Sequence, residues 1–135
     1  MAKKSWEEKF NKKSDFEIKT IDRSFWGYHA GSKILIPTPL LIQEYINQIE
    51  SGNQVAVERM RNDLAIEIGA DFTCPMTTGI FLRVVAEVNY ERLTRNNDSE
   101  ISPFWRVVDP KSKLADKLSF GKEIIIEKRA AEQAS

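Results

Sequence analysis

The amino-acid sequence predicts an α+β, helix-rich fold, and three observations lead to this prediction. Four segments carry apolar residues at helical spacing and are bounded by capping or helix-ending residues. One short apolar stretch, residues 33–36, has the length of a strand and is followed by proline. The chain has 135 residues and an ordinary globular composition, which is sufficient for one domain with its own hydrophobic core.

The N-terminal part of the chain carries the fewest structural signals. Residues 1–15 are predicted to form a charged lead-in, weakly helical or flexible, and residues 16–135 a single domain. Trp6 and Phe10 stand four positions apart, so one helix face can attach the lead-in to the domain. Residues 16–32 are rich in aromatic side chains. Their backbone state stays open, either part of a sheet or a cover over a pocket.

The first two helices of the domain have clear boundaries. Thr38 is expected to cap a helix that has Pro39 at its first position and continues to about residue 50. A second helix is predicted over residues 58–68, and Gly69 is well placed to end it. The inward positions of the first helix are Leu41, Tyr45, Ile46 and Ile49, and those of the second are Met60, Leu64, Ala65 and Ile68.

A long helix is predicted over residues 75–95, with Thr73 or Cys74 as its cap. Its expected buried positions are Ile80, Phe81, Val84, Val85 and Val88. The opposite face then carries Gly79, Leu82, Arg83 and Ala86. Because two of these residues are small, that face can approach a nucleic-acid backbone closely, or another part of the protein can pack on it. The helices over 58–68 and 75–95 form a plausible helix-turn-helix pair.

The C-terminal third is predicted to be more irregular. Residues 96–98 form a loop, and residues 105–108 are expected to be a short extended segment that turns at Asp109 and Pro110. A final helix is predicted over roughly residues 121–134. Arg106 is expected to act as a structural ion-pair partner, with Glu127 or Asp109 as the candidate carboxylates.

Residues 103–108 read Pro-Phe-Trp-Arg-Val-Val. This segment resembles the P-C-H-R-V-[VI] active-site segment of the O6-alkylguanine-DNA alkyltransferases. The resemblance extends over roughly residues 39–132: residues 52–57 look like the family's G-x-V-x-T-Y segment, and residues 75–90 look like its recognition helix. Residues 69–81 resemble a divergent branch of alkyltransferase-like proteins. The resemblance implies a winged-helix-like DNA-binding domain of the alkyltransferase C-terminal type, with a pocket formed by Pro103, Phe104, Trp105 and Arg106.

The departures from the family motif remove its chemistry. Phe104 stands where the family has its nucleophilic cysteine, and Trp105 stands where it has the general-base histidine. Alkyl transfer needs a thiolate activated by a neighbouring base, which neither side chain supplies. The base-flipping tyrosine and the arginine finger of the family fall on or near Glu58 and Gly79. The sequence therefore predicts a protein that is not an enzyme and needs no cofactor.

Double-stranded DNA is the partner that the resemblance implies, with other repair proteins as further partners. The formal net charge is zero, so DNA binding would have to depend on a local basic patch. Basic side chains gather at Arg106, Lys111, Lys113 and Lys117. The predicted DNA-binding residues are Thr77, Thr78, Gly79, Arg83, Lys111 and Lys113.

Cys74 and His29, the only cysteine and the only histidine, carry little further chemistry. Cys74 precedes a helix, where a thiolate is favoured, but a lone cysteine is usually a small buried hydrophobe. His29 is expected to be structural or solvent-facing. One histidine and one cysteine are too few for a zinc site, so no metal is expected.

These residues are compatible with three alternative functions. The first is a non-catalytic, alkyltransferase-like DNA-binding protein that recognises duplex DNA, including modified bases, for repair. The second is a protein-interaction or scaffold module that keeps the fold without binding DNA. The third, an active methyltransferase, requires Cys74 to lie in the pocket. The charged N-terminus lacks a signal-peptide core and no apolar run reaches about 20 residues, so a cytoplasmic protein without a membrane partner is expected.

Overall fold

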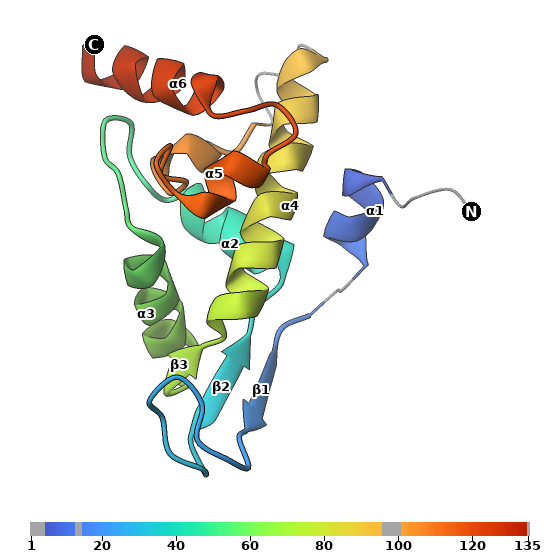
Figure 1. Cartoon of the computed structure of the whole chain (residues 1–135), viewed down its shortest axis with the longest axis vertical. Helices are drawn as coiled ribbons and strands as arrows, with labels where there is room; N and C mark the ends of the chain where they lie inside the picture. The colour runs from blue at the N-terminus through green and yellow to red at the C-terminus, as the bar shows by residue number, and fades with distance from the viewer. Residues whose placement is uncertain (1–4, 13–14, 96–100, 135) are drawn as a thin grey trace.

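The computed structural model describes residues 5–12, 15–95 and 101–134, and it has the helix-rich α+β architecture that the sequence predicts. A three-stranded sheet lies at one end of the molecule, and the long helix α4 (Pro75–Thr94) rises from it through the centre (Figure 1). The remaining helices surround α4, and the chain ends in helix α6 (Glu123–Ala134) across the opposite end. None of the described helices is both long and apolar enough to cross a bilayer.

The sheet answers the question left open by the aromatic segment. Strand β1 (Glu17–Thr20) pairs antiparallel with β2 (Lys33–Ile36), and β2 pairs in parallel with the short β3 (Phe72–Thr73). The predicted strand at residues 33–36 is therefore confirmed, and it is the central strand of the order β1-β2-β3. Residues 16–32 supply the edge strand β1 and the turn that connects it to β2 at this end of the molecule.

Helix α2 (Pro39–Ile46) begins as the sequence predicts, because the Thr38 hydroxyl accepts a hydrogen bond from the Leu41 N–H at 3.1 Å. It ends four residues earlier than predicted, although Ile49 is still buried. Helix α3 (Val57–Ile68) ends at Gly69, whose φ of 93° is the left-handed conformation that glycine adopts without a steric cost. Met60, Leu64 and Ala65 of α3 are buried as predicted.

Helix α4 is capped by Cys74, one of the two predicted candidates, and Val84, Val85 and Val88 are buried as predicted, but the predicted outer face is wrong. Ile80, expected in the core, is 61% exposed, whereas Leu82 and Ala86, expected outside, are fully buried. The reason is that α2, α1 (Trp6–Asn11) and the segment around Phe104 all pack on this helix. Its middle is enclosed on all sides and its first two turns are not, so a single apolar stripe does not describe it. Another part of the chain does pack on the Leu82 side.

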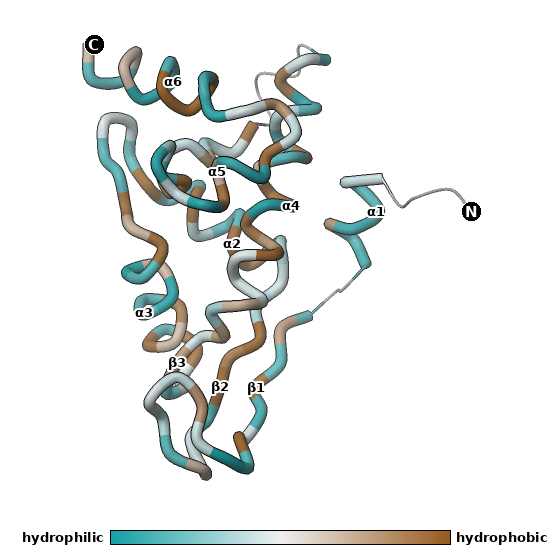
Figure 2. Tube along the Cα trace, in the orientation of Figure 1, coloured by the Kyte–Doolittle hydropathy of each residue, from teal (hydrophilic) through white to brown (hydrophobic). Residues whose placement is uncertain are grey.

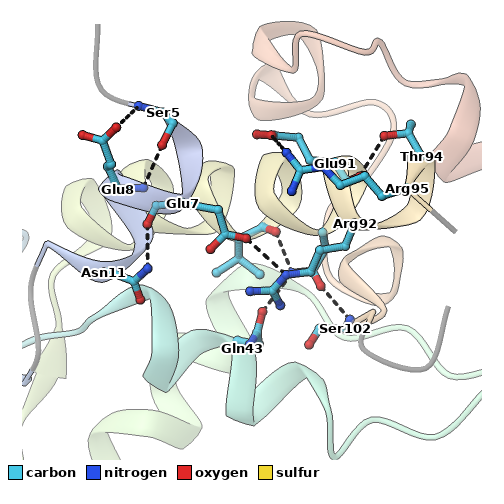
Figure 3. Close-up of polar contacts among 12 residues, drawn as sticks. Ser5, Glu7, Glu8, Asn11, Gln43, Glu91, Arg92, Thr94, Arg95 and Ser102 are labelled. Atoms are coloured by element: carbon cyan, nitrogen blue, oxygen red, sulfur yellow. Dashed lines mark hydrogen bonds and ion pairs between the residues drawn. The ribbon is translucent and has the colours of Figure 1, made fainter. Parts of the chain in front are cut away.

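Helix α1 attaches the described part of the lead-in to α4, as the spacing of Trp6 and Phe10 predicts. Phe10 is buried in the main core, and Trp6 packs against it from the outside. The Arg92 guanidinium of α4 lies 3.4 Å from the Glu7 carboxylate of α1 (Figure 3). Ser5 and Glu8 cap the start of α1 reciprocally.

The C-terminal third differs most from the expectation. Residues 104–106 form a 3₁₀ helix, η2 (Phe104–Arg106), where an extended segment was predicted, because the Phe104 carbonyl accepts the N–H groups of Val107 and Val108. A short helix, α5 (Lys113–Lys117), follows and was not predicted. The final helix is confirmed as α6. The loop predicted at residues 96–98 lies outside the described residues. Apolar segments of α2, α4 and β2 converge on the interior (Figure 2).

Candidate functional site

Phe104, the first residue of η2, is part of the hydrophobic core. Phe104 has no exposed surface, and its ring meets Phe120 edge-on with centroids 5.7 Å apart and Trp105 with centroids 5.3 Å apart. Edge-to-face contacts of this kind are favourable for aromatic rings in a core. The Phe104 ring is therefore fully enclosed by the protein and is not accessible to a ligand from solvent.

Trp105 and Arg106 point instead to the C-terminal helix. The Trp105 indole N–H donates to the Glu132 carboxylate at 2.9 Å, and the Arg106 guanidinium donates to the same group at 2.7 Å and 3.1 Å. Arg106 also donates to the Ile49 carbonyl. The predicted structural role of Arg106 is therefore confirmed, but its partner is Glu132. Neither Glu127 nor Asp109 pairs with it, because α6 crosses η2 through its last turns.

Glu132 is mostly buried, and its surroundings determine its ionisation. Burial alone would raise the pKa of this carboxyl, but hydrogen bonds from Arg106, Trp105 and the Gly52 N–H, together with the Arg106 charge, hold the pKa below its usual value. The ionised form is thus the one that the folded protein stabilises. The pair ties together η2, α6 and the loop after α2.

A pH dependence of stability follows from Glu132. Because its pKa is lower in the folded than in the unfolded protein, the pair contributes fully at neutral pH. This contribution to stability is lost as the pH falls below about 4.3, the pKa of a glutamate in the unfolded chain, and then through the lower pKa of Glu132 in the folded protein. Urea unfolding at several pH values is expected to show wild type losing stability more steeply than Glu132→Gln in this range. Parallel curves for the two proteins would contradict this assignment.

Arg129, one turn before Glu132, holds the same segment from α6. Its guanidinium donates to the carbonyls of Trp105 at 2.6 Å and Val108 at 2.9 Å, and to the Gln54 side chain at 2.9 Å. Burial lowers the pKa of Arg129, and nearby Asp109 opposes this change. Sequence reasoning missed Arg129 and Glu132. The available signal was two opposite charges three positions apart, on one face of the final helix.

A pocket of about 320 Å³ lies between residues 54–58 and residues 107–114, beside Arg129. We call it the loop pocket. Val107 and Val108 give it an apolar wall, while Glu58 and Asp109 give it acidic groups. Ser112 lines it, and its two neighbours Lys111 and Lys113 are exposed.

The four predicted pocket residues do not share one cavity. Pro103, Trp105 and Arg106 border a separate space of about 480 Å³ next to α2, whereas Phe104 faces the core. The reason is the 3₁₀ turn, which directs consecutive side chains to different sides. The residues of this segment that do line the loop pocket are Val107 and Val108.

The predicted DNA-binding residues on α4 are also divided. An added Cβ at Gly79 would meet nothing within 4 Å, so the helix surface is open there. Thr77 is partly exposed, but Thr78 is fully buried and its hydroxyl donates to the Cys74 carbonyl at 2.6 Å. Thr78 therefore cannot present its side chain to a ligand. Arg83 stacks over Trp6 of α1, with 5.2 Å from the guanidinium carbon to the ring centroid.

Cys74 and His29 lie away from the loop pocket. Cys74 is buried in a small cluster with Ile34 and Phe72, and its sulfur accepts the Thr77 N–H at 3.4 Å. It is not among the residues that line the loop pocket or the space bordered by Pro103, Trp105 and Arg106. His29 is exposed. Among the described residues, no group of three or more metal-ligating side chains comes together.

Two buried polar residues of α4 position the segments on either side of the site. The Asn89 side chain accepts the Ser102 N–H at 2.8 Å and donates to Gln43 at 2.9 Å, which fixes the approach to η2. The Glu87 carboxylate accepts the N–H of Ser119 at 2.8 Å and also its hydroxyl, which fixes the chain before α6. Sequence reasoning missed both residues, although polar side chains within an apolar run were the signal.

Comparison of the chain with protein-family models, with curated proteins and with solved structures finds no match. The geometry of the site and the chemistry of its residues are therefore the basis for assigning a function.

Proposed function

We propose that this protein is a non-catalytic, alkyltransferase-like DNA-binding protein with a winged-helix type of domain, which recognises duplex DNA for repair. The observation that carries the proposal is the open surface at the start of α4. Met76 and Ile80 are exposed there, and nothing lies within 4 Å of an added Cβ at Gly79. Gly79 adds no side-chain bulk to this surface, so the helix can approach a sugar-phosphate backbone closely at that position.

The arrangement of α3 and α4 supports the same function. Helix α3 ends at Gly69, β3 follows, and α4 begins at Pro75, so the connection between the two helices is short. The second helix of such a pair contacts DNA with its N-terminal residues in helix-turn-helix proteins. In this chain Met76 and Ile80 of these first turns are exposed, whereas Thr78 is buried.

Lys111 and Lys113 supply the electrostatic part of the proposed interface. Both are exposed beside the loop pocket, where their ammonium groups can contact phosphates. Two residues support a non-catalytic function. Phe104 is fully buried, and the indole N–H of Trp105 donates a hydrogen bond to Glu132. A lesion bound by such a protein would be handed to other repair factors.

Binding to a fluorescently labelled duplex at several salt concentrations tests the proposal. Wild type is expected to bind with an affinity that falls steeply with salt. The double variant Lys111→Glu, Lys113→Glu is expected to lower the slope of log K against log salt by about 2, since each lost phosphate contact removes about 0.9. Lys19→Glu, a charge reversal on the exposed strand β1, is the matched control and should change the slope little. No binding at about 50 mM salt would contradict the proposal.

The scaffold function remains the alternative, and one observation favours it. Met76 and Ile80 of α4 are large apolar residues with more than half of their surface exposed, as at protein interfaces. The variant Ile80→Lys separates the two functions. Added positive charge should strengthen duplex binding if DNA contacts this surface, whereas it should disrupt an apolar contact with a protein partner.

A further inference from the structure

The connection between β1 and β2 contains a tight turn with an unusual residue at its corner. Phe25 and Tyr28 exchange two backbone hydrogen bonds of 3.0 Å and 2.9 Å, and the residues between them, Trp26 and Gly27, have φ values of 52° and 82°. Two positive φ values are typical of the type I′ hairpin turn, whose first corner is usually asparagine, aspartate or glycine. A bulky aromatic residue in this conformation is a backbone outlier, and such outliers gather at functional sites.

The turn holds aromatic rings at the surface. Trp26 is 60% exposed, and its ring contacts Phe25 edge-on with centroids 6.4 Å apart. The Tyr28 ring stacks on Phe72 of β3, with centroids 4.0 Å apart and planes only 5° from parallel. Since Phe72 is fixed by the pairing of β3 with β2, the exposed tyrosine has a rigid support. Figure 1 shows this connection beside β3 at the sheet end of the molecule.

The rings of Trp26, Tyr28 and Phe72 form one side of a cavity of about 490 Å³, which we call the turn pocket. Helix α3 forms the other side with Glu58, Arg59, Arg61 and Asn62. Arg59 is strongly exposed and lies 3.7 Å from Asp63. Among the described residues, no carboxylate lies within 4.0 Å of the Arg61 guanidinium. The turn pocket thus combines aromatic faces with two guanidinium groups, of which Arg61 has no carboxylate within 4.0 Å among the described residues, and with one carboxylate, Glu58.

We propose that the turn pocket binds an unstacked nucleotide, with the base against Trp26 and the phosphate on Arg61 and Arg59. Aromatic side chains beside arginines are the groups that proteins use for unpaired bases and their phosphates. A cationic ligand would be repelled by the two guanidinium groups. An uncharged apolar ligand would form no ion pair or hydrogen bond with these guanidinium groups. A base inside a duplex does not expose the face that Trp26 requires.

The turn pocket adjoins the proposed duplex interface, because Pro75, the first residue of α4, lines it, and it shares Glu58 with the loop pocket. The two proposals are nevertheless tested by different residues, Trp26 and Arg61 for the nucleotide and Lys111 and Lys113 for the duplex. Loss of one kind of binding with the other retained therefore distinguishes them. The ligand chemistry, a base that carries a phosphate, has two sources: a free mononucleotide, or a nucleotide in a single strand.

The experiment follows the Trp26 indole N–H resonance of the ¹⁵N-labelled protein during titration with three probes. These probes are deoxyadenosine monophosphate, deoxyadenosine without phosphate, and a short single-stranded oligodeoxyadenylate. Saturable shifts are expected with both phosphate-bearing probes, and an affinity at least about fivefold lower for deoxyadenosine. An oligonucleotide that binds about tenfold or more tightly than the mononucleotide identifies a strand as the source, and equal affinities identify a free nucleotide.

Two variants distinguish recognition from a structural role. Arg61→Gln is expected to weaken mononucleotide binding about fivefold or more and to leave deoxyadenosine binding unchanged. Arg23→Gln also removes one positive charge, from the connection that carries Trp26 but outside the turn pocket, and should change neither affinity. Trp26→Asn places the preferred residue at the turn corner, so it should keep or raise Tm while abolishing binding. No saturable shift up to about 10 mM mononucleotide or oligonucleotide, or an Arg61→Gln variant with wild-type affinity, would overturn the proposal.

Discussion

Replacement of Phe104 by alanine is expected to lower the free energy of unfolding by about 3–5 kcal/mol, because it removes a fully buried ring and leaves a cavity. The ring contacts Phe120 and Trp105 edge-on, so its loss also removes two aromatic contacts. Urea unfolding monitored by circular dichroism measures the change. Phe104→Leu, which keeps much of the side-chain volume, is the matched control and should lower the free energy of unfolding by clearly less.

Phe104→Cys tests whether the fold still supports alkyl transfer. We expect no transfer of a methyl group from O6-methylguanine DNA to this cysteine, as measured by the mass of the protein. The new thiol would be buried in apolar surroundings, which raises its pKa, and no base stands next to it. The adjacent Trp105 donates its only N–H to Glu132 and accepts no proton. A variant that gains one methyl group per chain would show that the site is still catalytic.

Breaking the pair between Arg106 and Glu132 is the second large effect. Arg106→Met is expected to destabilise the protein by about 3–5 kcal/mol, because it leaves the Glu132 carboxylate buried without its charge partner. It also leaves the Ile49 carbonyl without the donor that Arg106 supplies. Free energies of unfolding of Arg106→Met, Glu132→Gln and the double variant form a double-mutant cycle. The double variant should be less destabilised than the sum of the single variants.

Strict additivity in this cycle would contradict the assignment of one shared interaction. Arg59→Met serves as the control, because Arg59 forms an exposed pair with Asp63. Exposed pairs of this kind contribute roughly 0–1 kcal/mol. Both Arg106 and Arg59 face a carboxylate at hydrogen-bond or ion-pair distance. The large difference expected between the two substitutions in the free energy of unfolding therefore follows from the burial of Arg106.

Local signals in the sequence were sufficient for much of the fold. The caps at Thr38 and Cys74 and the helix end at Gly69 depend on the chemistry of one or a few neighbouring residues, and the structure confirms all three. The faces of α4 depend on which elements pack around it. Periodicity could not show that Ile80 is left outside while Leu82 is enclosed, because that depends on contacts with residues far along the chain.

The site shows the same division. The aromatic residues Phe104 and Trp105 are visible in the sequence, but the 3₁₀ turn that buries the Phe104 ring is a tertiary outcome. The partner of Arg106 was missed because Glu132 is 26 residues away and reaches it only through the docking of α6. The strained turn at Trp26 carried a weak sequence signal, an aromatic residue directly before glycine.

Mapping of duplex DNA onto the protein by amide chemical shifts tests the central claim most directly. Titration of the ¹⁵N-labelled protein with a short duplex at low salt should perturb the amides at the start of α4, around Gly79, together with those of Lys111 and Lys113. High salt should reverse these changes, because phosphate contacts release counterions. The absence of any shift at low salt, or shifts confined to residues away from both segments, would contradict the account.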